Sequence, residues 1–169
     1  MLYASGIRRR PVSTATAAAA ATADTDMAWM RLALQHARQA DAEDCVPVGC
    51  VLVQTADSDD GRVTRVDCFR NGPRHFEHAE LLAVMALPSF VRNPCTVLYV
   101  SLEPCVMCAG AIVLARIPRL VYGAQSPLSS ATSTLLAGKP IAVTGGVLAH
   151  ESSALLSSFF KRQRLRTIA

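Results

Sequence analysis

Segments typical of buried strands alternate with helical segments along most of this 169-residue chain. Short apolar, β-branched runs between turn residues predict strands, and apolar residues repeating every three or four positions predict helices. The predicted strands are VPVGCVLV (46–53), RVTRVDCF (62–69), CTVLYVS (95–101), RLVYGA (119–124) and, as a short fifth, IAVTGGVL (141–148). The predicted helices are HAELLAVMA (78–86), CVMCAGAIVLAR (105–116) and the end of the chain from about Glu151. This alternation predicts a three-layer α/β domain.

The first 25 residues differ from the rest of the chain. They are rich in Arg, Ser, Thr and Ala and contain no acidic residue before Asp24. This composition suits an organelle transit peptide, and it also suits a disordered alanine-rich extension or a misplaced start codon. We expect the folded domain to cover residues 26–169. Asp26 is the expected N-cap of a first helix whose apolar residues are Met27, Met30, Leu34 and Ala37.

Composition also limits where the protein can work. No run of eighteen uncharged apolar residues is present, so no membrane-spanning helix and no membrane partner are predicted. No apolar signal-peptide core precedes a cleavage site. The six cysteines are therefore expected in a reduced compartment, where paired cysteines more often serve metal or redox chemistry than disulfides. We expect a cytoplasmic protein, with organelle import if residues 1–25 are a transit peptide.

The formal net charge is +4, and basic residues gather at both ends of the chain. Arg8, Arg9 and Arg10 lie near the start, and the last nine residues contain Lys161, Arg162, Arg164 and Arg166. The C-terminal group is either a solvated helix end, favoured by the helix dipole, or a binding surface for nucleic acid. Under the second interpretation, Arg162 and Arg164 contribute to RNA affinity.

Two cysteines lie three residues apart in the stretch EPCVMC, residues 103–108. Residues three apart share a face of a helix, so Cys105 and Cys108 can grip one ion. Pro104 suits the first position of that helix, where backbone N–H groups favour thiolates. By itself the pair also fits a thioredoxin-like redox site. A structural zinc site completed by Cys45 and Cys50 is another possibility. It is disfavoured because the side chains of Cys45 and Cys50 should point to opposite faces of a strand.

The stretch HAE, residues 78–80, favours a catalytic metal site. It opens one predicted helix as EPCVMC opens the next, and two such helices direct their N-termini to one place at the edge of a sheet. His78, Cys105 and Cys108 would supply three ligands and leave a fourth zinc position open, as in catalytic zinc sites. Glu80 is two residues, or about 200° of helix, from His78, so it would flank the ion and move protons rather than bind it.

HAE followed by PCVMC matches the zinc nucleoside-deaminase signature H-x-E…P-C-x-x-C. The longer run LYVSLEPCVMCAGAIVLARIPRLVYGA closely resembles tRNA adenosine deaminases, both the bacterial enzyme and the catalytic subunit of the eukaryotic one. WMRLALQHARQA, VPVGCVLV and ALLSSFFKRQR also fit, so the resemblance covers almost everything from Asp26 to Arg164. It implies a cytidine-deaminase-like α/β/α fold around a central mixed five-stranded sheet.

The resemblance also implies roles for single residues. His78, Cys105 and Cys108 correspond to the ligands of one Zn²⁺ per subunit, and Glu80 to the general acid/base. Asn71 in FRNGP corresponds to an asparagine that hydrogen-bonds the substrate base, although a turn residue before Gly72 would look the same. The other residues assigned to substrate binding are Val46, Val48 and Ala79; ordinary core valines would look identical. The implied reaction converts adenosine at the first anticodon position of tRNA to inosine, with the base splayed out of the anticodon loop.

The family acts as a dimer, so a homodimer is expected and a heterodimer is possible. Three segments depart from the family pattern and put the substrate in doubt. AQSPLSSATST, residues 124–134, lacks the usual Asp, Lys and Gly residues, PRHFE lacks the usual Asp-Pro, and the link from Met85 to Thr96 is short. An alternative substrate is therefore a free base or nucleoside: guanine, cytosine or cytidine. A non-catalytic RNA-binding subunit is a third interpretation, against which the presence of Glu80 counts.

Overall fold

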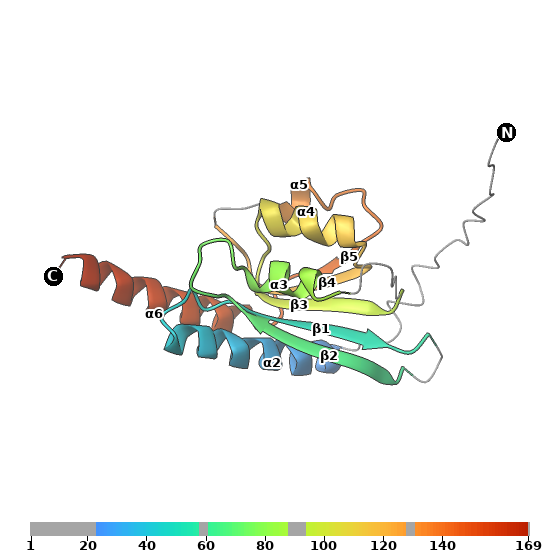
Figure 1. The fold of residues 1–169 in the computed structure, drawn as a ribbon, viewed down its shortest axis with the longest axis horizontal. Coiled ribbons are helices and arrows are strands. Elements are labelled where there is room, and N and C mark those ends of the chain that lie inside the picture. The colour runs from blue at the N-terminus through green and yellow to red at the C-terminus, as the bar shows by residue number, and fades with distance from the viewer. Residues whose placement is uncertain (1–22, 58–60, 88–93, 128–130, 169) are drawn as a thin grey trace.

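The computed structural model describes residues 23–57, 61–87, 94–127 and 131–168 (Figure 1). Its sheet has the strand order β2-β1-β3-β4-β5. β1 is antiparallel to both β2 and β3, whereas β3, β4 and β5 run parallel to one another. The strands are β1 (Gly49–Thr55), β2 (Val63–Arg70), β3 (Thr96–Leu102), β4 (Arg119–Ala124) and β5 (Ala142–Thr144). The predicted mixed five-stranded sheet is therefore confirmed.

Helices cover both faces of the sheet and complete the three layers. α2 and α6 lie against one face, and α3, α4 and α5 lie on the other (Figure 1). The helices are α2 (Ala23–Ala42), α3 (Ala79–Met85), α4 (Val106–Ala115), α5 (Ala131–Thr134) and α6 (Ala149–Ile168). None of the described helices is long and apolar enough to cross a membrane.

Several predicted boundaries differ from the observed ones. The first helix begins at Ala23, so Asp26 is inside the helix and is not its N-cap. The first strand begins at Gly49 rather than at residue 46, after a turn in which the Val48 N–H bonds to the Val46 carbonyl. The serine-rich segment, residues 124–134, contains the short helix α5, and its residues 128–130 lie outside the described residues. Residues 1–22 of the predicted N-terminal extension and residues 88–93 of the link before Thr96 also lie outside the described residues.

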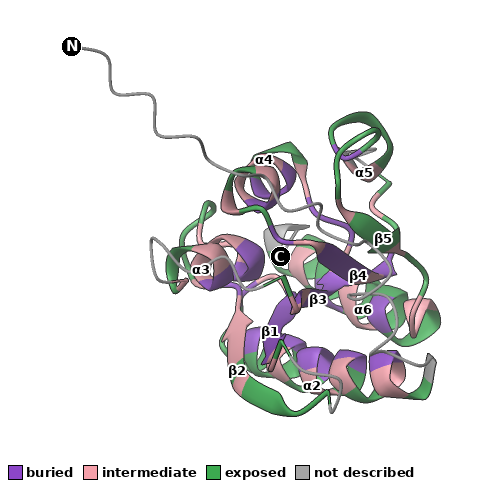
Figure 2. Cartoon of the chain, turned by 90° about the vertical axis from the view of Figure 1, so that its right-hand side faces the viewer, coloured by how far each residue is buried: buried purple, intermediate pink, exposed green. Residues whose placement is uncertain are grey.

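Two groups of buried apolar residues lie on the two faces of the sheet. One joins the sheet to α3 and α4 through Ala79, Ala83, Ala109 and Ile112, and the other joins it to α2 through Met30 and Ala33. Figure 2 shows the buried residues gathered on the sheet and on the inward sides of these helices. A Cβ atom on Gly49 would lie 2.0 Å from the Ala33 carbonyl oxygen, so glycine is needed where α2 crosses the start of β1.

A buried ion pair fixes the first turn of α2 to the sheet. The Arg119 guanidinium donates to both carboxylate oxygens of Asp26, at 2.8 and 2.7 Å. The Tyr99 hydroxyl donates to the same carboxylate at 3.0 Å, and the side chains of Asp26 and Arg119 are only 7% and 8% exposed. This is why Asp26 lies inside the helix: its carboxylate reaches across to β3 and β4 instead of capping its own backbone.

Arg119→Ala is expected to lower the free energy of unfolding by about 3–5 kcal/mol, because it leaves the Asp26 carboxylate buried without its cation. Urea denaturation followed by circular dichroism measures this loss. Arg70→Ala is the matched control, since Arg70 pairs with Glu43 at the surface and its removal should leave the midpoint close to that of the wild type. An Arg119 variant as stable as this control would contradict the structural role assigned to the pair.

Candidate metal centre

Three strands end at the same edge of the sheet. β2 and β3 are both antiparallel to β1, and β4 is parallel to β3, so Arg70, Leu102 and Ala124 all lie level with the start of β1. In open α/β sheets, ligands bind outside the carboxyl ends of the strands. The segments that leave this edge lead into α3 and α4, which therefore begin side by side.

The helix starts place the donor side chains. His78 is the N-cap of α3 and Cys105 is the N-cap of α4, both with extended backbone, and neither side chain caps its own helix. Cys108 is the third residue of α4, and the N-cap and third positions of a helix lie next to each other. Pro104 thus precedes the N-cap and does not occupy the first helical position predicted from the sequence.

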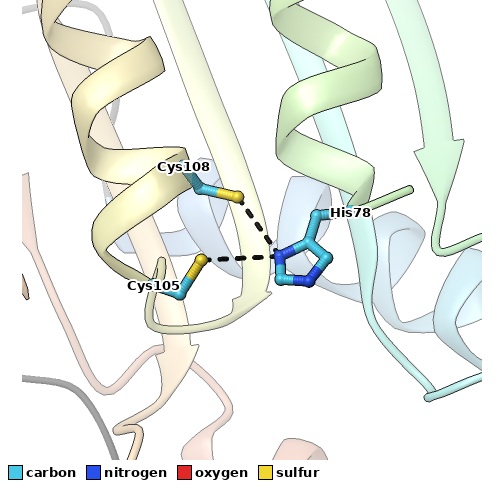
Figure 3. Close-up of side chains that lie close together, drawn as sticks. All are labelled: His78, Cys105 and Cys108. Carbon is cyan, nitrogen blue, oxygen red and sulfur yellow. Dashed lines mark hydrogen bonds between the residues drawn. The ribbon is translucent and has the colours of Figure 1, made fainter. Parts of the chain in front are cut away.

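The imidazole and the two sulfurs converge (Figure 3). Nδ1 of His78 lies 3.5 Å from the Cys105 sulfur and 3.4 Å from the Cys108 sulfur, and all three donor atoms lie within 4.8 Å of one another. A tetrahedral zinc with Zn–S near 2.3 Å and Zn–N near 2.05 Å holds such atoms about 3.6 Å apart. The spacing and the nitrogen and sulfur donor types therefore both fit zinc.

A backbone carbonyl selects which imidazole nitrogen faces the sulfurs. Nε2 of His78 lies 3.1 Å from the His75 carbonyl oxygen. A carbonyl only accepts, so Nε2 carries the proton and donates it. Nδ1 of the neutral ring then keeps its lone pair free for a metal. Such a second partner is typical of histidines that bind metals, because it fixes both the tautomer and the orientation of the ring.

Burial makes the Cys108 sulfur dependent on a cation. Burial raises the pKa of the Cys108 thiol well above its usual value, and the nearby Glu80 carboxylate raises it further. The dipole at the start of α4 therefore does not by itself produce a thiolate here. A divalent ion held by these residues would supply positive charge and displace the thiol proton, so its affinity would depend on pH.

Glu80 lies beside these ligands in the first turn of α3. Its side chain is only 3% exposed, and its Oε2 atom has no hydrogen-bond partner among the described residues. Burial raises the pKa of Glu80, and the neighbouring His78 and Cys108 side chains partly oppose that shift. A buried carboxylate oxygen without a partner is costly unless something else uses it.

The residues predicted to bind substrate lie around the same edge. Asn71 is nearly buried, and its side-chain oxygen accepts the N–H of Ala79 at 2.8 Å, which leaves its amide nitrogen to donate elsewhere. Ala79 is completely buried, Val48 is 4% exposed within the core, and Val46 is half-buried against it. Asn71 thus supports the start of the helix that follows His78.

The alternatives for the cysteines find no support. Within the described residues, the His, Cys, Asp and Glu side chains close enough to hold a metal are those of His78, Cys105 and Cys108. All six cysteines are free thiols, and Cys45 and Cys50 are not part of this cluster. A four-cysteine site and a disulfide at CVMC are therefore both absent from the structure.

Sequence reasoning missed a carboxylate that ties the centre to the next loop. Glu103 is 2% exposed. Its carboxylate accepts hydrogen bonds from the Ser126 N–H, at 3.1 Å, and from the Thr132 hydroxyl. Its own backbone N–H donates to the Ala124 carbonyl at 2.8 Å. Two residues before Cys105, it links the start of α4 to the segment after β4. The only signal in the sequence was a charged residue within an apolar run.

Comparisons with known proteins agree with this geometry. The family model for the cytidine and deoxycytidylate deaminase zinc-binding region matches residues 23–124. The tRNA-specific adenosine deaminase of Haemophilus influenzae is 37% identical over 157 residues, which cover 87% of this chain and 90% of that protein. The tRNA-specific adenosine deaminase of Agrobacterium fabrum is 40% identical over 153 residues, which cover 81% and 95%.

A solved structure from a study of A-to-I editing by tRNA:A34 deaminases is also similar to this chain. It has a TM-score of 0.61 and 37% sequence identity, and the match covers 76% of this chain and 98% of that one. The expected cytidine-deaminase-like fold is therefore confirmed, and the matched region contains all three donor residues and Glu80. Because the family model matches more than half of the chain and relatives are similar along most of it, the chain belongs to the cytidine and deoxycytidylate deaminase family.

Proposed function

We propose that this protein hydrolyses adenosine to inosine at the first anticodon position of tRNA, releasing ammonia. The observation that carries the proposal is the convergence of His78, Cys105 and Cys108 next to a buried, unpartnered carboxylate oxygen of Glu80. Relatives that are 37% and 40% identical are tRNA-specific adenosine deaminases, which supports tRNA as the substrate. The target base has to leave its stack to reach such a site, as unpaired anticodon bases readily do.

His78, Cys105 and Cys108 would hold the zinc ion. Zinc, when bound, lowers the pKa of water to roughly 7 and so supplies a hydrolytic nucleophile at neutral pH. Glu80 would carry two protons in turn at Oε2: it would take one from the attacking water and give it to the purine ring nitrogen, and would then take the remaining hydroxyl proton and give it to the departing amine, which leaves as ammonia. Its burial suits this role, since a raised pKa brings a carboxyl closer to the pH at which it both accepts and returns a proton.

The base would be held by groups at the same edge. The Asn71 amide nitrogen would donate to the purine, while its oxygen stays on the Ala79 N–H and keeps the amide oriented. Ala79, Val46 and Val48 would line the apolar sides of the base site. Thiol ligands require a reduced compartment, so we propose that the domain, residues 26–169, works in the cytoplasm.

Glu80→Gln is expected to lower kcat for inosine formation by about 10²–10⁴-fold, because the amide cannot move a proton, while bound zinc stays near one per chain. Inosine is measured by nuclease digestion and chromatography of an anticodon stem-loop that begins its anticodon with adenosine, and zinc by elemental analysis. Glu151→Gln on the exposed face of α6 is the control. Loss of most of the zinc in the Glu80 variant would count against its assignment as a proton carrier.

α6 offers a charged surface for the RNA. Its C-terminal half projects beyond the edge where β1 begins, which is also the edge that carries the metal centre (Figure 1). Arg162 pairs with Asp41, and Arg166 pairs with Asp44 at 2.6 Å, so these two charges are partly neutralised. Lys161 and Arg164 are exposed and, within the described residues, pair with no carboxylate. We therefore propose that Lys161 contacts RNA phosphates in place of Arg162, and that Arg164 contacts them as predicted from the sequence.

The double variant Lys161→Ala/Arg164→Ala should weaken RNA binding and reduce the slope of log affinity against log salt by about 1–2, since each phosphate contact contributes nearly one counterion. The matched control is Arg162→Ala/Arg166→Ala, which removes the same net charge from the same helix. Fluorescence anisotropy with a labelled stem-loop at several salt concentrations measures both slopes. Equal losses in the two double variants would show that only net charge matters.

The outer face of α4 supports a homodimer. No residue of α4 is charged, yet Val106, Met107 and Leu114 are 63%, 41% and 85% exposed. Met107, Gly110 and Leu114 share one face, and a Cβ on Gly110 would meet open space, so another helix can approach closely there. A helix that is apolar all round is normally buried. We propose that a second copy of this chain covers this face, with a different partner subunit as the alternative.

Leu114→Glu is expected to convert the dimer to a monomer, because it places a charge in the middle of the proposed interface. Sedimentation velocity of the two proteins measures the change directly. Leu165→Glu, at an exposed apolar position on α6, should leave the dimer intact. A wild-type chain that sediments as a monomer would exclude the homodimer.

A further inference from the structure

The segment between β2 and α3 carries an exposed aromatic residue close in sequence to a metal ligand. Phe76 is 59% exposed and lies two residues before His78. Two residues of chain span at most about 7 Å, so the backbone that carries this ring is close to the metal ligand. Phenylalanine is among the residues most often buried, and here it faces solvent at the edge where substrate is expected.

Hydrogen bonds within the segment hold Phe76 at the surface. The Gly72 N–H donates to the Glu77 carbonyl, and the Glu77 N–H donates to the Arg74 carbonyl, both at 2.9 Å. The Glu77 carboxylate also accepts from the Arg74 N–H at 3.3 Å and from its guanidinium at 3.0 Å. A Cβ on Gly72 would lie 2.4 Å from that carboxylate, so a larger residue there would have to displace the Glu77 side chain.

Two hydrogen bonds tie this loop and the residue before it to the metal centre. The His75 carbonyl accepts from Nε2 of His78 at 3.1 Å, and the Asn71 side chain accepts the Ala79 N–H at 2.8 Å. Phe76 lies between these two anchors. The backbone that carries Phe76 is therefore positioned relative to the metal ligands before any substrate arrives, which reduces the entropy lost when something binds there.

The neighbours of Phe76 suit single-stranded RNA. His75 is exposed on the same loop. Arg74 is paired with Glu77, which partly neutralises its charge, but its side chain is 70% exposed and its planar guanidinium can still stack on a base. A flat aromatic ring with a guanidinium and an imidazole nearby is a combination found where proteins bind unpaired nucleotides. Stacking accepts any base, because every base has a π-face.

We propose that Phe76 is a stacking platform for the unpaired base next to the target adenosine. This inference rests on the proposed function. An adenosine that enters the metal centre loses its stacking on its neighbour, and the exposed ring replaces that contact from the protein side. Phe76 is in this view a substrate-binding residue that selects unpaired RNA over a free nucleoside, and it takes no part in proton transfer.

The test is a double-mutant cycle that needs only binding. Three proteins are compared: the wild type, Phe76→Leu and Phe76→Trp. Each is titrated with a stem-loop that carries adenosine at the first anticodon position. Each is also titrated with two versions of this RNA, in which the nucleotide on the 5′ or the 3′ side of that adenosine is abasic. For one of the two sides, base removal should weaken wild-type binding by about 5- to 150-fold. Phe76→Leu should show that loss on the intact RNA and little further loss on the abasic one, whereas Phe76→Trp should bind like the wild type.

Several results would overturn the inference. The stacking role would be wrong if Phe76→Leu bound the intact RNA as tightly as the wild type does. It would also be wrong if the effects of Phe76→Leu and of base removal multiplied at both abasic positions. In either case the proposed function would stand as long as the wild type forms inosine. A change of Phe76→Leu from dimer to monomer in sedimentation would assign the ring to the subunit interface instead. A wild-type protein that neither binds the stem-loop nor forms inosine would overturn the proposed function and the inference together.

Discussion

The direction of β2 and β3 relative to β1 determines where chemistry can occur in this protein. Because both are antiparallel to β1, they end at one edge, and the helices that follow them begin side by side. The small buried residues Ala79, Ala83 and Ala109 line the α3 and α4 layer of the core, where larger side chains would hold the helices further from the sheet. His78 and Cys105 are both N-caps, so the imidazole and the sulfurs meet where the two helices start. A shift of either helix by one residue would separate the donors.

In the part of the chain that the structure describes, three carboxylates are buried, and their partners distinguish their roles. Asp26 is neutralised by Arg119, which is the arrangement of a structural ion pair. Glu103 has neutral donors, the Ser126 N–H and the Thr132 hydroxyl, and so joins two segments of chain. Glu80 alone has an oxygen without a partner among the described residues. Since an unsatisfied buried carboxylate destabilises the folded state, its retention at the metal centre is understandable if the oxygen is used in the reaction.

Much of this arrangement could be predicted from local sequence patterns. The strand RLVYGA was predicted with the observed bounds, and the spacing of Cys105 and Cys108 together with HAE indicated the metal centre. What sequence alone could not give are contacts between distant residues. Asp26 looked like an N-cap, because nothing local indicates an arginine 93 residues away. The same holds for Arg162, whose charge is offset by Asp41 on another helix, and for the His75 carbonyl, which has no side-chain signature at all.

The metal centre and the loops beside it are held in different ways. The donors are fixed by helix starts and by the sheet, whereas the segments 72–77 and 125–127 depend on a few hydrogen bonds, several of them to Glu77 and Glu103. Side-chain changes in those segments can therefore alter what approaches the metal, as long as the His75 carbonyl keeps its contact with Nε2 of His78. The chain combines H-x-E and P-C-x-x-C with two segments, PRHFE and the serine-rich one, that differ from the pattern expected from the family resemblance. It also places the determinants of substrate choice in residues such as Phe76, which the metal-binding signature does not include.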